Sequence, residues 1–177
     1  MGASVGDTFK EYLEFSLAGK LGSFSYYAFE PDRESFESLA ALAQEYSQLE
    51  AIYGAVGSVS GVCQISGAEK MSTAFWSEGL NMRKVPLYAL DDYSFSKGIP
   101  TVIKADVEGN EIRVLEGASK LIKKYRPDLI FSIYHKKEDL WEIPLFIHNL
   151  NLGYKIHIRQ QSASYGETIV YAIAENN

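Results

Sequence analysis

Short apolar runs alternate with amphipathic stretches along most of the chain, and this alternation restricts the fold more than any other sequence feature. The apolar run 101–106, for example, is followed by a stretch in which Ile112, Leu115 and Ala118 recur at helical spacing. Strands alternating with helices of this length indicate βαβ units and a mainly parallel sheet, so we expect an α/β fold. The pattern predicts strands at 25–30, 51–57, 62–65, 85–92, 101–106, 128–135, 154–159 and 168–174, and helices at 7–18, from the Asp32 cap, at 111–125 and at 140–150.

The last two predicted strands break this alternation. Only a short polar loop separates 154–159 from 168–174, which indicates an antiparallel hairpin at the C-terminal end. Ligands of open α/β sheets bind outside the carboxyl ends of the strands. Candidate site residues are therefore sought where each predicted strand ends.

Charge, cysteine content and hydropathy exclude several classes of protein. The net charge is −6 and no long basic run is present, so we expect no nucleic-acid partner. The single cysteine, Cys63, excludes an internal disulfide and suits a reducing compartment. No apolar run approaches the roughly 20 residues of a membrane span, and the start of the chain lacks the pattern of a signal peptide. We expect one cytoplasmic domain over residues 1–177 without membrane attachment.

A glycine turn at 2–8, "GASVGDT", is the first candidate site. Gly2 and Gly6 bracket a turn that leads into a helix, and glycine lets a backbone approach a ligand closely. A helix start also offers free N–H groups to an anion. The spacing is not that of a dinucleotide fingerprint, and a frayed terminus is the alternative reading.

Glu30 ends a predicted strand in "AFEPD", 28–32, one βα unit after that turn. An acid at this point is placed to hold two ribose hydroxyls, as in nucleotide-binding sheets. The alternative is a solvated glutamate that is stabilised by the start of the next helix.

Two further acids follow the buried strand in "IKADVEGNE", 103–111. Asp106 ends the strand, Glu108 follows at the opening of the expected site, and Gly109 permits a tight turn into a helix. Because burying an unpaired carboxylate is strongly unfavourable, the pair should face a cleft, a ligand or a helix start. For Glu108, helix-start electrostatics with Glu111 as its companion is the alternative.

His135 ends the predicted strand 128–135, so we expect it beside Asp106. A histidine near a carboxylate in a cleft is a candidate general base, although a histidine at a strand end is as often a structural hydrogen bonder. Asp106, Glu108 and His135 also carry metal-ligand atoms. Since no His or Cys pair at ligand spacing supports a metal, we expect none.

Five segments together resemble the FkbM family of methyltransferases over nearly the whole chain. They occur in the family's order: "GASVGDT", "YYAFEPD", "YALDDY", "IKADVEGNEIRVLEGA" and "PDLIFSIYHKKEDLWEIP". The resemblance implies a Rossmann-like class I methyltransferase fold. It also implies S-adenosylmethionine (SAM) as methyl donor, and a hydroxyl oxygen of a small molecule, sugar, glycan or natural product as acceptor.

The resemblance also implies roles for single residues. His135, Asp106 and Glu108 are the expected catalytic residues. His135 would take the proton of the hydroxyl group, and Asp106 and Glu108 would lie near the methyl acceptor. Glu30 is expected at the ribose, and Ala55 and Val56 at the adenine. The residues expected to bind the cofactor are Gly2, Ala3, Gly6, Glu30, Pro31, Ala55, Val56 and Asp106.

One departure from the family pattern affects the expected assembly. The pattern begins with a strand that ends in an acid before the glycine turn, so we expect the first strand to be missing and the domain to be truncated at its N-terminus. An exposed sheet edge would favour a homo-oligomer. It also supports an alternative function, a non-catalytic binding or scaffold module. Residues 58–84, with Phe75, Trp76 and Met82, are expected to shape the acceptor pocket, or else to form a flap over the core.

Overall fold

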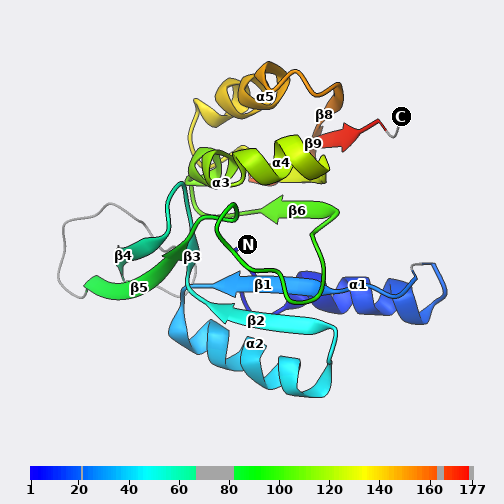
Figure 1. Cartoon of the computed structure of the whole chain (residues 1–177), viewed down its shortest axis with the longest axis vertical. Coiled ribbons are helices and arrows are strands. Elements are labelled where there is room, and N and C mark those ends of the chain that lie inside the picture. The colour runs from blue at the N-terminus through cyan, green and yellow to red at the C-terminus, as the bar shows by residue number, and fades with distance from the viewer. Residues whose placement is uncertain (21, 67–81, 163–165, 176–177) are drawn as a thin grey trace. The chain divides into compact units, whose positions relative to one another are not determined.

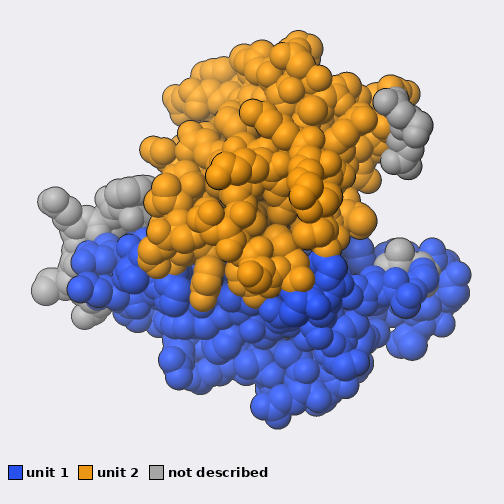
Figure 2. All heavy atoms as spheres, in the orientation of Figure 1, with its two compact units in different colours: residues 1–55, 62–86, 96–98 blue, residues 56–61, 87–95, 99–177 orange. Residues whose placement is uncertain are grey.

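The computed structural model describes residues 1–20, 22–66, 82–162 and 166–175, which divide into two compact units. Unit 1 comprises Met1–Ala55, Val62–Pro86 and Ser96–Gly98, and unit 2 comprises Val56–Gly61, Leu87–Phe95 and Ile99–Asn177 (Figure 2). The predicted pocket residues Phe75 and Trp76 lie outside the described residues. The single domain over 1–177 stays a prediction.

Unit 1 contains a parallel βαβ unit. β1 (Tyr26–Glu30) pairs in parallel with β2 (Leu49–Tyr53), and α2 (Arg33–Glu45) connects them (Figure 1). Asp32 caps α2, as predicted, because its carboxylate accepts a hydrogen bond from the Ser35 N–H at 3.0 Å. α1 (Asp7–Leu17) precedes this unit.

The core of unit 1 is built around Phe9 of α1. Its side chain is fully buried with Ala28, Leu39 and Leu49. Its ring centroid lies 5.6 Å from that of Tyr26 and 5.6 Å from that of Tyr46, in edge-on contacts typical of aromatic clusters. This packing fixes α1 against β1 and α2.

The predicted strand 51–57 is wrong as one element. Gly54 separates β2 from β3 (Ala55–Val56) with φ 148°, a conformation that residues with side chains rarely adopt. β3 belongs to a three-stranded sheet of order β3-β5-β4, with β4 at Gly61–Ser66 and β5 at Met82–Tyr88. β3, β4 and β5 each contain a boundary between the two units.

Unit 2 contains a four-stranded sheet of order β6-β7-β9-β8. β6 and β7 are parallel, whereas β9 is antiparallel to both β7 and β8. The predicted C-terminal antiparallel pairing is therefore confirmed. The elements of this unit are β6 (Val102–Ala105), α3 (Glu111–Gly117), α4 (Ser119–Tyr125), β7 (Asp128–Ser132), α5 (Asp139–Asn149), β8 (Tyr154–Gln160) and β9 (Thr168–Ala174) (Figure 1).

The sheets are thus partly mixed. The strands of the described residues form three sheets, so the single, mainly parallel Rossmann-like sheet expected from the sequence is unconfirmed. The missing first strand stays a prediction. No helix in the described part of the chain is long and apolar enough to cross a membrane.

The predicted helix 111–125 is also wrong as one element, because Asp91 divides it. The Asp91 carboxylate accepts hydrogen bonds from the N–H groups of Lys120 at 3.0 Å and Leu121 at 2.8 Å. The Asp91 N–H donates to the Gly117 carbonyl at 2.8 Å. Asp91 therefore satisfies the end of α3 and the beginning of α4.

Gly117 permits close packing at the end of α3. A Cβ atom at this position would lie 2.0 Å from the Gly57 carbonyl oxygen, a distance that no side chain tolerates. The glycine of the segment "LEGA" is therefore required by packing.

Candidate functional site

Glu30 and the glycine turn come together at the carboxyl end of β1 in unit 1. The Glu30 side chain is buried, with one oxygen accepting the Ser4 N–H at 2.7 Å and the other accepting the Asp32 N–H at 2.8 Å. Burial raises the pKa of Glu30, and these two hydrogen bonds oppose the rise. The carboxylate thus connects the turn to the start of α2.

The glycine turn adopts a backbone that favours glycine. Gly2 has φ 66° and Gly6 has φ 87°. A Cβ atom on Gly6 would lie 2.9 Å from the Leu42 side chain, so this residue is also tightly packed. The Ala3 N–H donates to the Phe29 carbonyl at 3.3 Å, which attaches the turn to β1.

The other predicted cofactor residues of this region are buried. Pro31, directly after Glu30, is buried, and Ala55 and Val56 of β3 are buried as well. The roles of these residues at a cofactor stay predictions.

In unit 2, a sharp turn follows β6 and carries the predicted acids. Asp106 comes directly after the strand, while Glu108 and Gly109 have φ values of 54° and 86°. A positive φ is uncommon for a residue with a side chain, so the Glu108 backbone is strained. The Lys136 ammonium donates to the Gly109 carbonyl and fastens this turn to the segment after β7.

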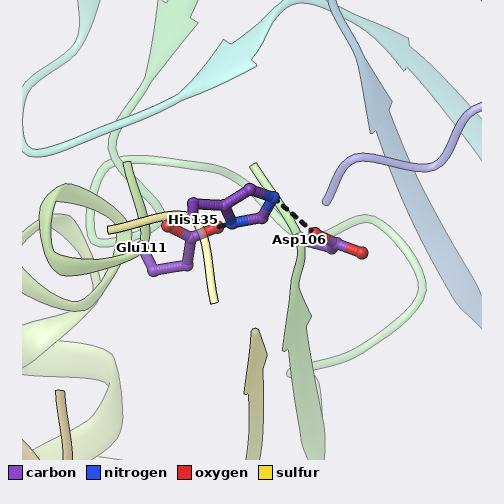
Figure 3. Close-up of side chains that lie close together, drawn as sticks. All are labelled: Asp106, Glu111 and His135. Atoms are coloured by element: carbon purple, nitrogen blue, oxygen red, sulfur yellow. Dashed lines mark ion pairs between the residues drawn. The ribbon is translucent and has the colours of Figure 1, made fainter. Parts of the chain in front are cut away.

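His135 lies among three carboxylates, and Figure 3 shows two of them, those of Asp106 and Glu111. The position of His135 beside Asp106 is as predicted. Its Nε2 atom is 3.4 Å from Asp106 Oδ1 and 3.4 Å from Glu108 Oε2. Its Nδ1 atom is 3.0 Å from Glu111 Oε1. The position of His135 at a strand end was wrong, because β7 ends at Ser132 and His135 lies in the segment leading to α5.

Glu111 is the site residue that the sequence reasoning missed. Its side chain is 0% exposed, and its Oε1 atom also accepts the Val107 N–H at 2.9 Å. The signal was present in the helical period, since Glu111 shares a face of the helix with the buried residues Leu115 and Ala118. An acid at a core-facing position requires a partner.

Burial and charge shift the proton affinities of this cluster. Burial lowers the pKa of His135, but Glu111, Asp106 and Glu108 outweigh it, so the pKa is raised above 6.5. Burial also raises the pKa of Glu108, with the nearby histidine opposing the rise. His135 therefore holds its proton more tightly than an ordinary histidine.

Tyr134 completes the surroundings of Asp106. Its hydroxyl donates to the two Asp106 carboxylate oxygens at 3.1 and 3.3 Å. Burial, together with the negative charge of Asp106, raises the pKa of Tyr134 to about 12. The phenol thus remains a donor across the physiological pH range.

Asp106, Glu111 and His135 also offer metal-ligand atoms, one from each residue, all within 4.8 Å of one another. The contacts of His135 with the carboxylates explain the cluster equally well, since an imidazolium compensates their charge. The expectation of no metal stays a prediction.

Two comparisons with known proteins each cover most of the chain. The family described as "Methyltransferase FkbM domain" matches residues 1–156. The crystal structure of the methyltransferase FkbM from Methylobacillus flagellatus KT matches with a TM-score of 0.73 and 24% sequence identity, a likeness that concerns the fold. The match covers 97% of this chain and 41% of the length of that one. No curated protein matched the chain.

Proposed function

Because the chain belongs to the FkbM methyltransferase family, we propose that it transfers a methyl group from SAM to a hydroxyl oxygen of a small-molecule, sugar or natural-product acceptor. The observation that carries the choice of oxygen is the position of His135. Its Nε2 atom faces two carboxylates, an arrangement suited to accepting a proton from a hydroxyl group.

The residues at the end of β1 fit a ribose. Each Glu30 oxygen accepts one backbone N–H, and an ionised carboxylate oxygen has a second acceptor site. Two hydroxyl groups could therefore be held without breaking the existing hydrogen bonds. In unit 1 we assign SAM binding to Gly2, Ala3, Gly6, Glu30 and Pro31.

Further contacts with SAM are part of the proposal. We assign Ala55 and Val56 to the adenine and Asp106 to the ammonium group. When bound, SAM supplies a methyl group on a sulfonium ion, whose carbon–sulfur bond breaks as a carbon–oxygen bond to the acceptor forms.

The side chains of unit 2 handle the proton and the acceptor. His135 Nε2 takes the proton that the hydroxyl group loses, which balances the transfer of one methyl group. Glu108 and Asp106 accept hydrogen bonds from the acceptor and orient it. Positioning of this kind supplies much of the rate in group transfer.

We propose that the protein acts in the cytoplasm and has no nucleic-acid partner. The acidic composition argues against nucleic acid as a partner, and the single cysteine suits the cytoplasm. A homo-oligomer is the expected assembly, and light scattering of the purified chain tests it.

Methyl transfer is tested with SAM labelled in its methyl group and a panel of monosaccharides and natural-product alcohols. We expect label in a methyl ether, and a loss of about 10²-fold or more in rate for His135→Gln. His157→Gln in β8, an exposed position, is the matched control. Equal rates for both variants would contradict the role of His135, and label on nitrogen or carbon would contradict the choice of oxygen.

A further inference from the structure

Glu111 carries a buried negative charge that the packing of α3 does not require. The neighbouring core positions on its helix face, Leu115 and Ala118, are apolar and fully buried. Burying a carboxylate is unfavourable unless it is paired. Its contacts with charged or polar groups are the Val107 N–H at 2.9 Å and His135 Nδ1 at 3.0 Å.

The two ring nitrogens of His135 have different surroundings. Nδ1 faces the buried Glu111, whereas Nε2 faces Asp106 (Figure 3). Nε2 also faces Glu108, and the Asp106 and Glu108 side chains are 33% and 38% exposed. A neutral imidazole carries one proton, and a carboxylate beside either nitrogen favours the proton on that nitrogen. Glu111 is closer to the ring, at 3.0 Å against 3.4 Å for Asp106 and Glu108, and its side chain is excluded from water, so we expect the proton on Nδ1. Nε2 is left as the acceptor on the more exposed side.

On the basis of the proposed function, we propose that Glu111 is a positioning residue, which holds the proton of the neutral His135 ring on Nδ1 and so keeps Nε2 free to act as base. When Nε2 takes the acceptor's proton, Nδ1 keeps its own, and the resulting imidazolium faces the Glu111 side chain. The carboxylate therefore stabilises the charge that develops on the ring.

The contact between His135 Nδ1 and Glu111 is close, but it is not a formed hydrogen bond. The Nδ1 and Oε1 atoms are 3.0 Å apart, yet both His135 Nδ1 and Glu111 Oε2 lack hydrogen-bond partners among the described residues. Catalytic hydrogen bonds are often poorly aligned without substrate and tighten when it binds.

Other groups also act on His135 and must be held constant in a test. Asp106 and Glu108 face Nε2, and Asp139 of α5 is close enough to interact by charge. The Tyr134 ring lies tilted against the His135 ring, with centroids 4.2 Å apart. Substituting Glu111 alone leaves these groups in place. Glu116 lies on the same helix in an exposed ion pair with Arg113, so Glu116→Gln is a matched control.

The test is an NMR titration of the histidine rings, which needs neither SAM nor an acceptor. The chain has three histidines, and His135→Gln identifies the His135 signals by their loss. We expect Glu111→Gln to lower the pKa of His135 by about one pH unit or more and to reduce the share of the Nδ1–H tautomer. Glu116→Gln should change neither.

An unchanged His135 pKa and tautomer in Glu111→Gln would overturn the inference, whether or not the protein transfers methyl groups. If Glu111→Gln does not fold, Glu111→Met removes the buried charge while keeping the volume, and the same titration applies. In methyl transfer, the acid limb of the rate should move to lower pH in Glu111→Gln. If Glu111→Gln lowers the pKa of His135 as expected but the unchanged protein transfers no methyl group, only the proposed function is contradicted.

Discussion

His135 Nδ1 lies 3.0 Å from an oxygen of Glu111, whose side chain is completely buried at the start of α3. The opposite nitrogen of the ring lies 3.4 Å from both Asp106 and Glu108. A buried acid and two partly exposed acids thus hold one imidazole between them. This relationship determines how the activity and the stability of the protein should depend on pH.

Methyl transfer should increase as pH rises through the pKa of His135. Only the neutral ring accepts a proton, and the pKa of His135 is raised above 6.5, so the acid limb of the rate should lie above that value. Because the pKa of Tyr134 is about 12, this residue should add no alkaline limb below about pH 11. The measurement is kcat/KM against pH. A rate that is flat from about pH 6 to about pH 9 would contradict the base.

The stabilisation from His135 should be greatest at low pH. A group whose pKa is raised on folding contributes stability that is fully present below its unfolded pKa and is lost as pH rises through the folded value. His135→Gln should therefore lower the free energy of unfolding more at about pH 6 than at about pH 9. Urea unfolding at both values checks this, with His157→Gln as control. An equal loss at the two pH values would show that the ring contributes only packing.

Gly117→Ala should destabilise unit 2. The added Cβ would lie 2.0 Å from the Gly57 carbonyl oxygen, and relieving that clash requires a shift of the backbone. We expect a loss of about 1–3 kcal/mol in the free energy of unfolding, measured with urea. Gly61→Ala is the control, because a Cβ there meets nothing within 4 Å. Similar stabilities for the two variants would refute the packing role of Gly117.

Asp91→Ala should loosen the beginning of α4. It removes the acceptor of the Lys120 and Leu121 N–H groups, and lost helix caps typically reduce stability by about 1–2 kcal/mol. Asp92→Ala is the neighbouring control, since that carboxylate accepts an exposed hydroxyl hydrogen bond from Ser60. Thermal unfolding measures the stability of both variants. If Asp92→Ala were as unstable as Asp91→Ala, the hydrogen bonds of Asp91 to α4 would not explain the loss.

The local signals in the sequence predicted much of the fold. Asp32 caps α2, the strand before Glu30 ends as expected, and the C-terminal strands pair antiparallel. These features depend on neighbouring residues or on short loops, which a single sequence displays. The proximity of His135 to Asp106 was also predictable, because parallel neighbouring strands end at the same edge of a sheet.

The remaining features depend on contacts between distant segments. Asp91 divides a continuous helical pattern from almost 30 residues away. Gly117 lies at the break, but a single glycine is tolerated within a helix and is a weak signal by itself. Glu111 was expected only as the helix-start companion of Glu108, because the helical period indicates its core-facing position but not its contact with His135. The partner of Glu111, His135, is 24 positions later and lies beyond the end of β7.

A calorimetric titration of the chain with SAM tests the central claim most directly. We expect saturable binding that weakens about tenfold or more in Glu30→Gln, because the substitution replaces an acceptor of ribose hydroxyl groups. Glu37→Gln, in an exposed ion pair with Arg33 on α2, should bind as the unchanged chain does. No heat and no thermal shift with SAM would contradict the account and favour a non-catalytic binding module.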